Sequence, residues 1–221
     1  MLSNTIFNTG EGSVMGGGNS NTTIKKGDVI GGGNNNTVSG PYASILAGRA
    51  NTVTGAHSVI GGGDGNVVLG TNSGILAGKS NTVSGNVSAI LAGKDNRVTG
   101  NYSIAAGEES IVSGNYASIL GGKENTVNAD YSTILGGQLN SIATSDVKRV
   151  TGGNTNGSGN NTWYAFIGGG YLNHIAGTHS TILSGKKNSI NGDRSVIVGG
   201  KENTLIGDEI SIAGGTGIQG N

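Results

Sequence analysis

Hydrophobic residues recur along this chain in two short runs that repeat every 15 residues. Residues 81–93, NTVSGNVSAILAG, show one copy: asparagine opens the unit, a valine follows two residues later, and a second run ends on alanine and glycine. A fixed period with glycine after each run is typical of solenoids, whose stacked repeats share one core. The pattern predicts an all-β parallel β-roll, in which each coil contains two short strands joined by tight corners.

The second hydrophobic run supplies a column that predicts 14 coils. Its spacing of 15 is interrupted by one deletion near Tyr102 and by insertions between Asn140 and Asn161. We therefore expect residues 1–221 to form a single solenoid domain, with irregular coils and an inserted loop at 140–172. The column consists of Met15, Ile30, Ile45, Ile60, Ile75, Ile90, Ile104, Ile119, Ile134, Val150, Ile167, Ile182, Ile197 and Ile212.

A further apolar column follows one residue after this one. Neighbouring residues of a strand point to opposite faces, so if the isoleucines face inward, this column faces outward. An exposed stripe of this length exceeds what monomers usually tolerate, which favours burial between copies in a parallel homotrimer. The alternative is a monomeric roll with leucine inside and isoleucine outside. The predicted trimer seam is Leu46, Leu76, Leu91, Leu120, Leu135, Leu183 and Val198.

Glycine and asparagine also form columns. The glycine columns that include Gly40 and Gly48 predict two corners with positive φ, which glycine adopts without a steric penalty. The asparagine column that includes Asn36 and Asn51 predicts amides stacked in a hydrogen-bonded ladder.

Composition excludes several classes of function. The 13 basic and 13 acidic residues balance, so nucleic acid and anionic membrane surfaces are not expected partners. No apolar run approaches the roughly 20 residues of a membrane-spanning helix, so no membrane insertion is expected. The chain has no cysteine, its three histidines lack metal-ligand spacing, and no catalytic motif occurs. We expect no enzyme activity, no metal and no cofactor.

The repeat pattern N-[TS]-V-x-G-x-x-[SA]-x-I-[LG]-[AG]-G, present from about Asn4 to Gly215, resembles the YadA-like head repeats of trimeric autotransporter adhesins. It is also similar to repeat tracts of phage tail fibres. The resemblance implies a left-handed parallel β-roll, association into a homotrimer, and binding to surfaces. The sequence shows no heptad stalk and no anchor pattern, which favours a virion over an autotransporter.

The expected function is therefore a structural or adhesive fibre segment, such as a phage tail fibre or surface spike. Its expected place is a virion or an extracellular or cell surface. Expected partners are other fibre or baseplate proteins and a host surface glycan or protein, and a bacterial adhesin head is the alternative.

A loop with aromatic residues is the candidate receptor contact. Loops inserted into a solenoid lie on its surface and often carry recognition, and tryptophan and tyrosine suit carbohydrate or protein contact. The candidate residues are Trp163, Tyr164, Asn156 and Ser158. The alternative is that Trp163 fills a gap in an irregular coil.

Two other surface series stay open. A corner series either binds a glycan or covers the coil below; it comprises Tyr42, His57, Tyr102, Tyr116, Tyr131, Tyr164, His179, Arg194 and Glu209. Outward hydroxyl pairs at residues 37/39, 52/54 and 82/84 resemble those of flat ice-binding solenoids. Arg97, Ile111, Asn128 and His174 interrupt this array, and ice binding is the further functional alternative.

Overall fold

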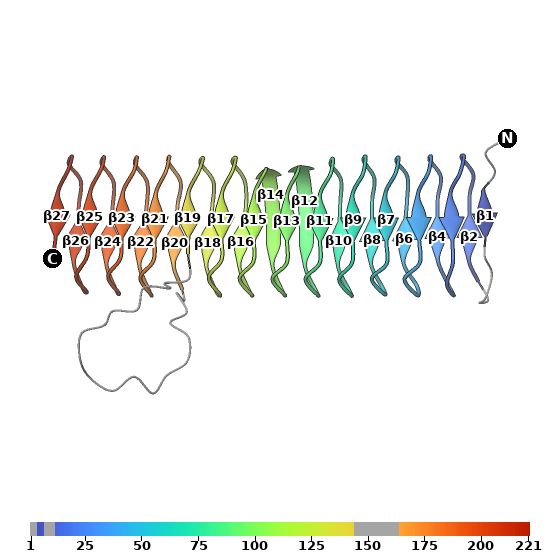
Figure 1. The fold of residues 1–221 in the computed structure, drawn as a ribbon, viewed down its shortest axis with the longest axis horizontal. Helices are drawn as coiled ribbons and strands as arrows, with labels where there is room; N and C mark the ends of the chain where they lie inside the picture. Colours follow the sequence, from blue (N-terminus) through green and yellow to red (C-terminus); the bar gives the residue numbers. More distant parts are fainter. Residues whose placement is uncertain (1–3, 7–11, 144–163) are drawn as a thin grey trace, which may run out of the picture. The chain divides into compact units, whose positions relative to one another are not determined.

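The computed structural model describes residues 4–6, 12–143 and 164–221. Within these ranges the regular elements are all short β-strands. Successive strands alternate between two parallel sheets, with odd-numbered strands in one and even-numbered strands in the other (Figure 1). The chain divides into two compact units, Met1–Val112 and Ser113–Asn221, called unit 1 and unit 2 below. The predicted all-β parallel β-solenoid is confirmed.

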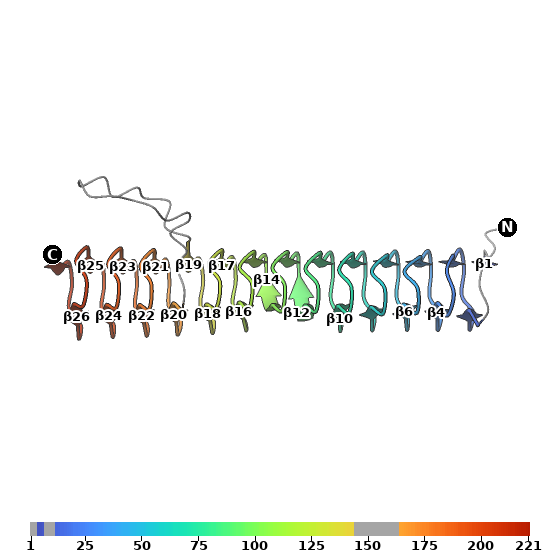
Figure 2. The ribbon, with the colours of Figure 1, turned by 90° about the horizontal axis from the view of Figure 1, so that it is seen from below.

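In unit 1, each strand pairs with the strand one coil away, and Figure 2 shows the two sheets on opposite sides of the coil. The odd-numbered strands are β1 (Thr5–Ile6), β3 (Thr22–Thr23), β5 (Thr37–Val38), β7 (Thr52–Val53), β9 (Val67–Val68), β11 (Thr82–Val83), β13 (Arg97–Val98) and β15 (Ile111–Val112). The even-numbered strands are β2 (Val14–Met15), β4 (Val29–Ile30), β6 (Ser44–Ile45), β8 (Val59–Ile60), β10 (Gly74–Ile75), β12 (Ala89–Lys94) and β14 (Ile104–Glu108).

Unit 2 has the same plan. Its odd-numbered strands are β17 (Thr126–Val127), β19 (Ser141–Ile142), β21 (His174–Ile175), β23 (Ser189–Ile190), β25 (Thr204–Leu205) and β27 (Gln219–Gly220). Its even-numbered strands are β16 (Ser118–Ile119), β18 (Thr133–Ile134), β20 (Phe166–Ile167), β22 (Thr181–Ile182), β24 (Val196–Ile197) and β26 (Ser211–Ile212).

The core is a pair of facing β-branched columns inside the coil. Ile45, Ile60 and Ile75 of the even-numbered strands are fully buried, as are Val38 and Val53 of the odd-numbered strands. Each such side chain contributes about 1.5–3 kcal/mol when it leaves water. The isoleucine column therefore faces inward as predicted, and the alternative roll with leucine inside is wrong.

The deletion lies later than the sequence suggested. Ile90 pairs with Ala105 and Ala89 pairs with Ile104, so Ala105 is the buried residue and Ile104 is exposed. The register then shifts, and Gly93 pairs with Gly107. The prediction that Ile104 occupies the core was wrong, because the missing residue falls between Ala105 and Gly107 rather than near Tyr102.

The coil count also changes in unit 2. Ile134 of β18 pairs directly with Ile167 of β20, so no rung separates these two residues. The predicted rung at Val150 was therefore wrong, and Val150 itself lies outside the described residues. The even-numbered strands of the described residues number 13 rather than the predicted 14.

The two glycine columns serve different purposes. Gly48 has a φ of 113°, which confirms a positive φ at that corner. Gly40 does not have a positive φ; a Cβ there would overlap with the carbonyl oxygen of Gly55 in the next coil. The positive φ at this corner belongs to Tyr42, at 57°, and His57, at 54°. The Gly40 column therefore allows coils to stack closely rather than to turn.

The asparagine ladder joins successive coils inside each unit. The main-chain N–H of Asn81 donates to Oδ1 of Asn66 (3.0 Å), and the N–H of Asn96 donates to Oδ1 of Asn81 (3.0 Å). The Asn81 Nδ2 also donates to the carbonyl of Gly93 (2.9 Å). These side chains are buried, so each one satisfies polar groups that would otherwise be unpaired.

Candidate functional site

The outer side of the odd-numbered strands in unit 1 forms a face of hydroxyl and aliphatic side chains, which we call the hydroxyl face. Thr37 pairs with Thr52, Thr52 with Val67, and Val67 with Thr82, so equivalent side chains stand in register in adjacent coils. The full set is Thr22, Ile24, Thr37, Ser39, Thr52, Thr54, Val67, Leu69, Thr82 and Ser84.

This face is regular in two directions. Adjacent parallel strands lie about 4.8 Å apart, and outward residues two positions apart along a strand lie about 6.6 Å apart. The backbone hydrogen bonds between coils continue one residue past the strands. The N–H of Ser39 donates to the carbonyl of Val53 (2.8 Å), and the N–H of Thr54 donates to the carbonyl of Val68 (2.9 Å). Threonine and valine have restricted χ1 rotation, so their outer atoms are held at fixed positions.

No charged side chain belongs to the hydroxyl face between Thr22 and Ser84. The first charge in the column is Arg97, which pairs with Thr82 in β11 and with Ile111 in β15. In unit 2 the equivalent column includes His174, whose imidazole pKa is lowered by burial. The column of unit 2 also lacks charged side chains in the described residues, but asparagine, alanine and glutamine interrupt its hydroxyls. Unit 1 therefore carries the more regular array of hydroxyl and aliphatic side chains.

The outer side of the even-numbered strands carries the predicted leucine column. Leu46 is 57% exposed, Leu76 68% and Leu91 45%, and Leu120, Leu135, Leu183 and Val198 are also exposed. In unit 1, Gly31 and Gly61 occupy the same position in other coils. The column thus faces outward as predicted, and the trimer it was expected to form stays a prediction.

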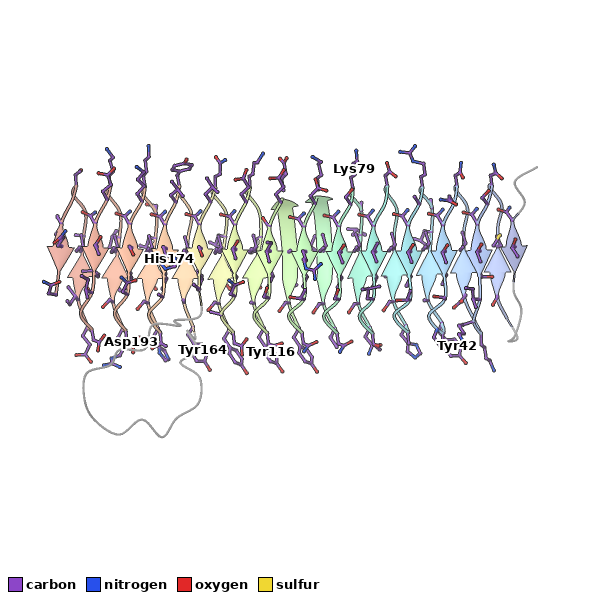
Figure 3. All side chains as sticks on the ribbon, viewed as in Figure 1. Tyr42, Lys79, Tyr116, Tyr164, His174 and Asp193 are labelled. Carbon is purple, nitrogen blue, oxygen red and sulfur yellow. The ribbon has the colours of Figure 1, made fainter. Side chains whose placement is uncertain are left out.

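The corner series contains stacked rings. In unit 2, Tyr116, Tyr131, Tyr164 and His179 form a continuous column that we call the aromatic stack, with ring centroids 4.9, 5.3 and 5.1 Å apart. In unit 1, Tyr42 stacks on His57 at 5.4 Å. Figure 3 shows Tyr116, Tyr164 and Asp193 projecting from the same edge of the coil.

The candidate receptor contact is described only at Tyr164, which is 52% exposed and stacks between Tyr131 and His179. Trp163, Asn156 and Ser158 lie outside the described residues. The sequence had placed Tyr164 both in the loop patch and in the corner series, and the ring contacts put it in the corner series.

One buried carboxylate was not singled out by the sequence. Asp28 occupies the inward position held by Ala43 and Ser58 in the following coils, and its Oδ2 accepts the N–H of Lys25 (2.7 Å). Its Oδ1 has no hydrogen-bond partner, and burial raises the pKa of the carboxyl group. The signal in the sequence is that Asp28 is charged, whereas the residues at the same position in the following coils are small.

Other kinds of site are not found in the part of the chain that the structure describes. Residues 4–6, 12–143 and 164–221 contain no group of three or more histidine, cysteine, aspartate or glutamate side chains that could hold a metal ion. Within the same ranges, no helix has the length and apolar character needed to cross a membrane. Within these ranges, the regular outer faces and the aromatic stack are the candidate binding surfaces.

Part of the chain is similar to a known protein family. Residues 57–121 match the model of a family described as the grass antifreeze beta roll. The matched segment covers less than half of the chain, and it includes Val67, Leu69, Thr82 and Ser84 of the hydroxyl face. No curated protein matches the chain.

Proposed function

We propose that this protein is an ice-binding β-solenoid and that the hydroxyl face of unit 1 is the surface that contacts ice. The observation that carries the proposal is the uncharged, in-register array from Thr22 to Ser84. The similarity of residues 57–121 to the grass antifreeze beta roll supports the same function, since that family is named for antifreeze activity.

The mechanism follows from the regularity of the face. Threonine hydroxyls hydrogen-bond water, while their methyl groups and the neighbouring valines exclude it, so water over the face is held in ordered positions. The two spacings of the array, about 4.8 Å and about 6.6 Å, repeat from coil to coil, so the water that the face holds is ordered in a regular two-dimensional pattern. The rigid backbone ladder removes most of the entropy cost of presenting such an array.

Thr52 lies near the centre of the array and provides the test. Replacement by lysine, T52K, inserts a long hydrated cation that keeps ice from contacting the neighbouring rows. We expect adsorption to ice to weaken about tenfold, which is about 1.4 kcal/mol in adsorption free energy, and thermal hysteresis to fall with it. The measurement is thermal hysteresis together with ice-crystal shaping, at matched protein concentrations.

The matched control is S44K, which places the same charge on the outer side of the even-numbered strands, where Ser44 is half-buried. Its thermal hysteresis should equal that of the unmodified protein, and circular dichroism should show that both variants remain folded. Absence of hysteresis in the unmodified protein, or equal loss in the two variants, would contradict the proposal.

A second candidate function, a self-associating fibre segment, is favoured by the exposed leucine column. Leu46, Leu76 and Leu91 are each at least 45% exposed, and in unit 1 the rest of the column consists of glycine and alanine, which would let another chain approach closely. In this proposal three copies share the leucine seam, and the fibre is carried on a virion or at a cell surface and contacts a host glycan or protein.

Oligomeric state tests this second candidate. Analytical ultracentrifugation at micromolar concentration should give a trimer, and L76D should shift it to monomer because three carboxylates would be brought together in an apolar seam. S39D, on the opposite side of the coil, should remain trimeric. A monomer at all concentrations would eliminate the trimer.

A further inference from the structure

The aromatic stack of unit 2 is not used by the ice-binding proposal. Its rings project from the corner rather than from the hydroxyl face, and Tyr116, Tyr131 and Tyr164 are 49%, 44% and 52% exposed. Tyr116 and Tyr131 are almost parallel, with an interplanar angle of 2°, and the rings of Tyr131 and Tyr164 make 24°. The ring faces therefore cover one another, and the edges and polar tips face solvent.

The backbone under the stack is one that large side chains rarely adopt. Tyr116, Tyr131, Tyr164 and His179 have φ values between 53° and 56°. A left-handed conformation costs a non-glycine residue about 1–2 kcal/mol. In unit 1 the same position holds Asn72 and Val87, with φ of 54°, so the corner does not require an aromatic residue. The four rings in successive coils of unit 2 thus form a feature beyond what the turn needs.

The charge beside the stack is negative. Oδ1 of Asp130 accepts the N–H of Asn115 (2.7 Å), and Oδ1 of Asp193 accepts the N–H of Thr178 (2.7 Å). These bonds fix the carboxylates in the corner next to the rings. Past His179 the column continues with Arg194 and Glu209, which form an ion pair of 2.8 Å and so neutralise each other. A strongly anionic ligand is disfavoured at this edge.

Ring centroids in successive coils of the chain lie 4.9 to 5.4 Å apart. A linear polymer that contacts one ring with each of its units must therefore have a similar length per unit. Nucleic acid is anionic, and in a duplex each strand advances about 3.4 Å per nucleotide. An extended peptide advances about 3.3 Å per residue, and a polyproline helix about 3.1 Å. An extended chain of 1,4-linked β-pyranoses advances by nearly one strand spacing per sugar, so that each sugar meets one ring.

We propose that the aromatic stack binds a linear, uncharged, β-1,4-linked glycan that lies alongside the rings, with one sugar per coil. The phenol groups and the imidazole of His179 exchange hydrogen bonds with sugar hydroxyls, and the carboxylates of Asp130 and Asp193 accept from hydroxyls at the side. Because the ring faces are already stacked, the glycan contacts ring edges and polar tips rather than lying flat on one ring.

Isothermal titration calorimetry of the full chain with β-1,4-linked glucose oligomers of one to six sugars tests the proposal. Affinity should rise with each added sugar through the tetramer, because the stack of unit 2 holds four rings. An oligomer of β-1,4-linked uronic acid should bind more weakly, because Asp130 and Asp193 repel it. No binding of any neutral oligomer, affinity independent of length, or tighter binding of the uronic acid would each overturn the proposal.

Variants of Tyr131 separate ligand contact from support of the corner. Y131F keeps the ring and removes one hydroxyl, so tetramer affinity should fall about 3- to 10-fold, the effect of one hydrogen bond. Y131N removes the ring but introduces asparagine, which already occupies the equivalent corner position at Asn72. It should abolish the increase in affinity for oligomers longer than two sugars. The control Y42N changes the equivalent corner of unit 1 and should leave affinity unchanged.

A melting curve for each variant shows whether it is folded, so a change in affinity can be assigned to the lost contact. If Y131N lowers the melting temperature but binds the tetramer as the unmodified protein does, the rings only cover the corner and the glycan site is rejected. Thermal hysteresis does not enter this comparison, so the outcome is independent of whether the hydroxyl face binds ice.

Discussion

Replacement of Asn81 by alanine is expected to lower the free energy of unfolding by about 3 kcal/mol or more. The change removes the acceptor for the N–H of Asn96, which is buried, and the donor to the carbonyl of Gly93, which is half-buried. A buried donor or acceptor that loses its partner costs about 1–3 kcal/mol. The cavity left by the side chain adds to this loss, and urea denaturation followed by circular dichroism measures the sum.

The control for this ladder variant is N128A. Asn128 is exposed on the outer side of an odd-numbered strand, and alanine there should change stability by less than about 0.5 kcal/mol. If N81A and N128A had the same effect, the amide ladder would contribute little and the isoleucine columns alone would hold the coils together. A loss below about 1 kcal/mol in N81A would lead to the same conclusion.

The glycine column that includes Gly48, next to the asparagine ladder, gives a second large effect. We expect G48A to destabilise the protein by about 3 kcal/mol or more, because two penalties add. The residue has a φ of 113°, and an added Cβ would overlap with the carbonyl oxygen of Gly63 in the next coil. The same Cβ would approach Nδ2 of Asn51 to 2.5 Å, and so disturb the amide ladder as well.

Gly32 offers a matched comparison within the same unit. An added Cβ at Gly32 meets nothing within 4 Å, and its φ is not positive. G32A should therefore be neutral or slightly stabilising, through the lower entropy of its unfolded chain. Equal melting temperatures for G48A and G32A would show that coils can move apart at this corner at little cost.

The sequence predicted the parts of the fold that depend on side-chain period. Period-2 alternation separated the buried Ile45 from the exposed Leu46, and repeated asparagines indicated the amide ladder. It could not place the deletion, because Ile104 and Ala105 are both apolar and either one satisfies the pattern. Only the pairing of Ile90 with Ala105 decides between them.

Backbone conformation was harder to predict than burial. Glycine suggests a positive φ, yet Gly40 is required for another reason: the backbone of the next coil lies against its Cα. The sequence of a single repeat does not reveal this contact between coils. Tyr42 adopts the left-handed conformation instead, although tyrosine has no preference for it. The hydroxyl pairs and the aromatic corner series were recognised as columns, but their register and ring contacts required the structure.

The direct pairing of Ile134 with Ile167 has a practical consequence. Residues 144–163 enter the chain between Ala143 and Tyr164, while the rungs on either side keep the register that uninterrupted coils have. The strands on either side of this junction therefore stay paired although 144–163 are inserted between them. An engineer could replace the segment with an antigenic peptide or an enzyme recognition tag, and keep a stiff, disulfide-free scaffold for display.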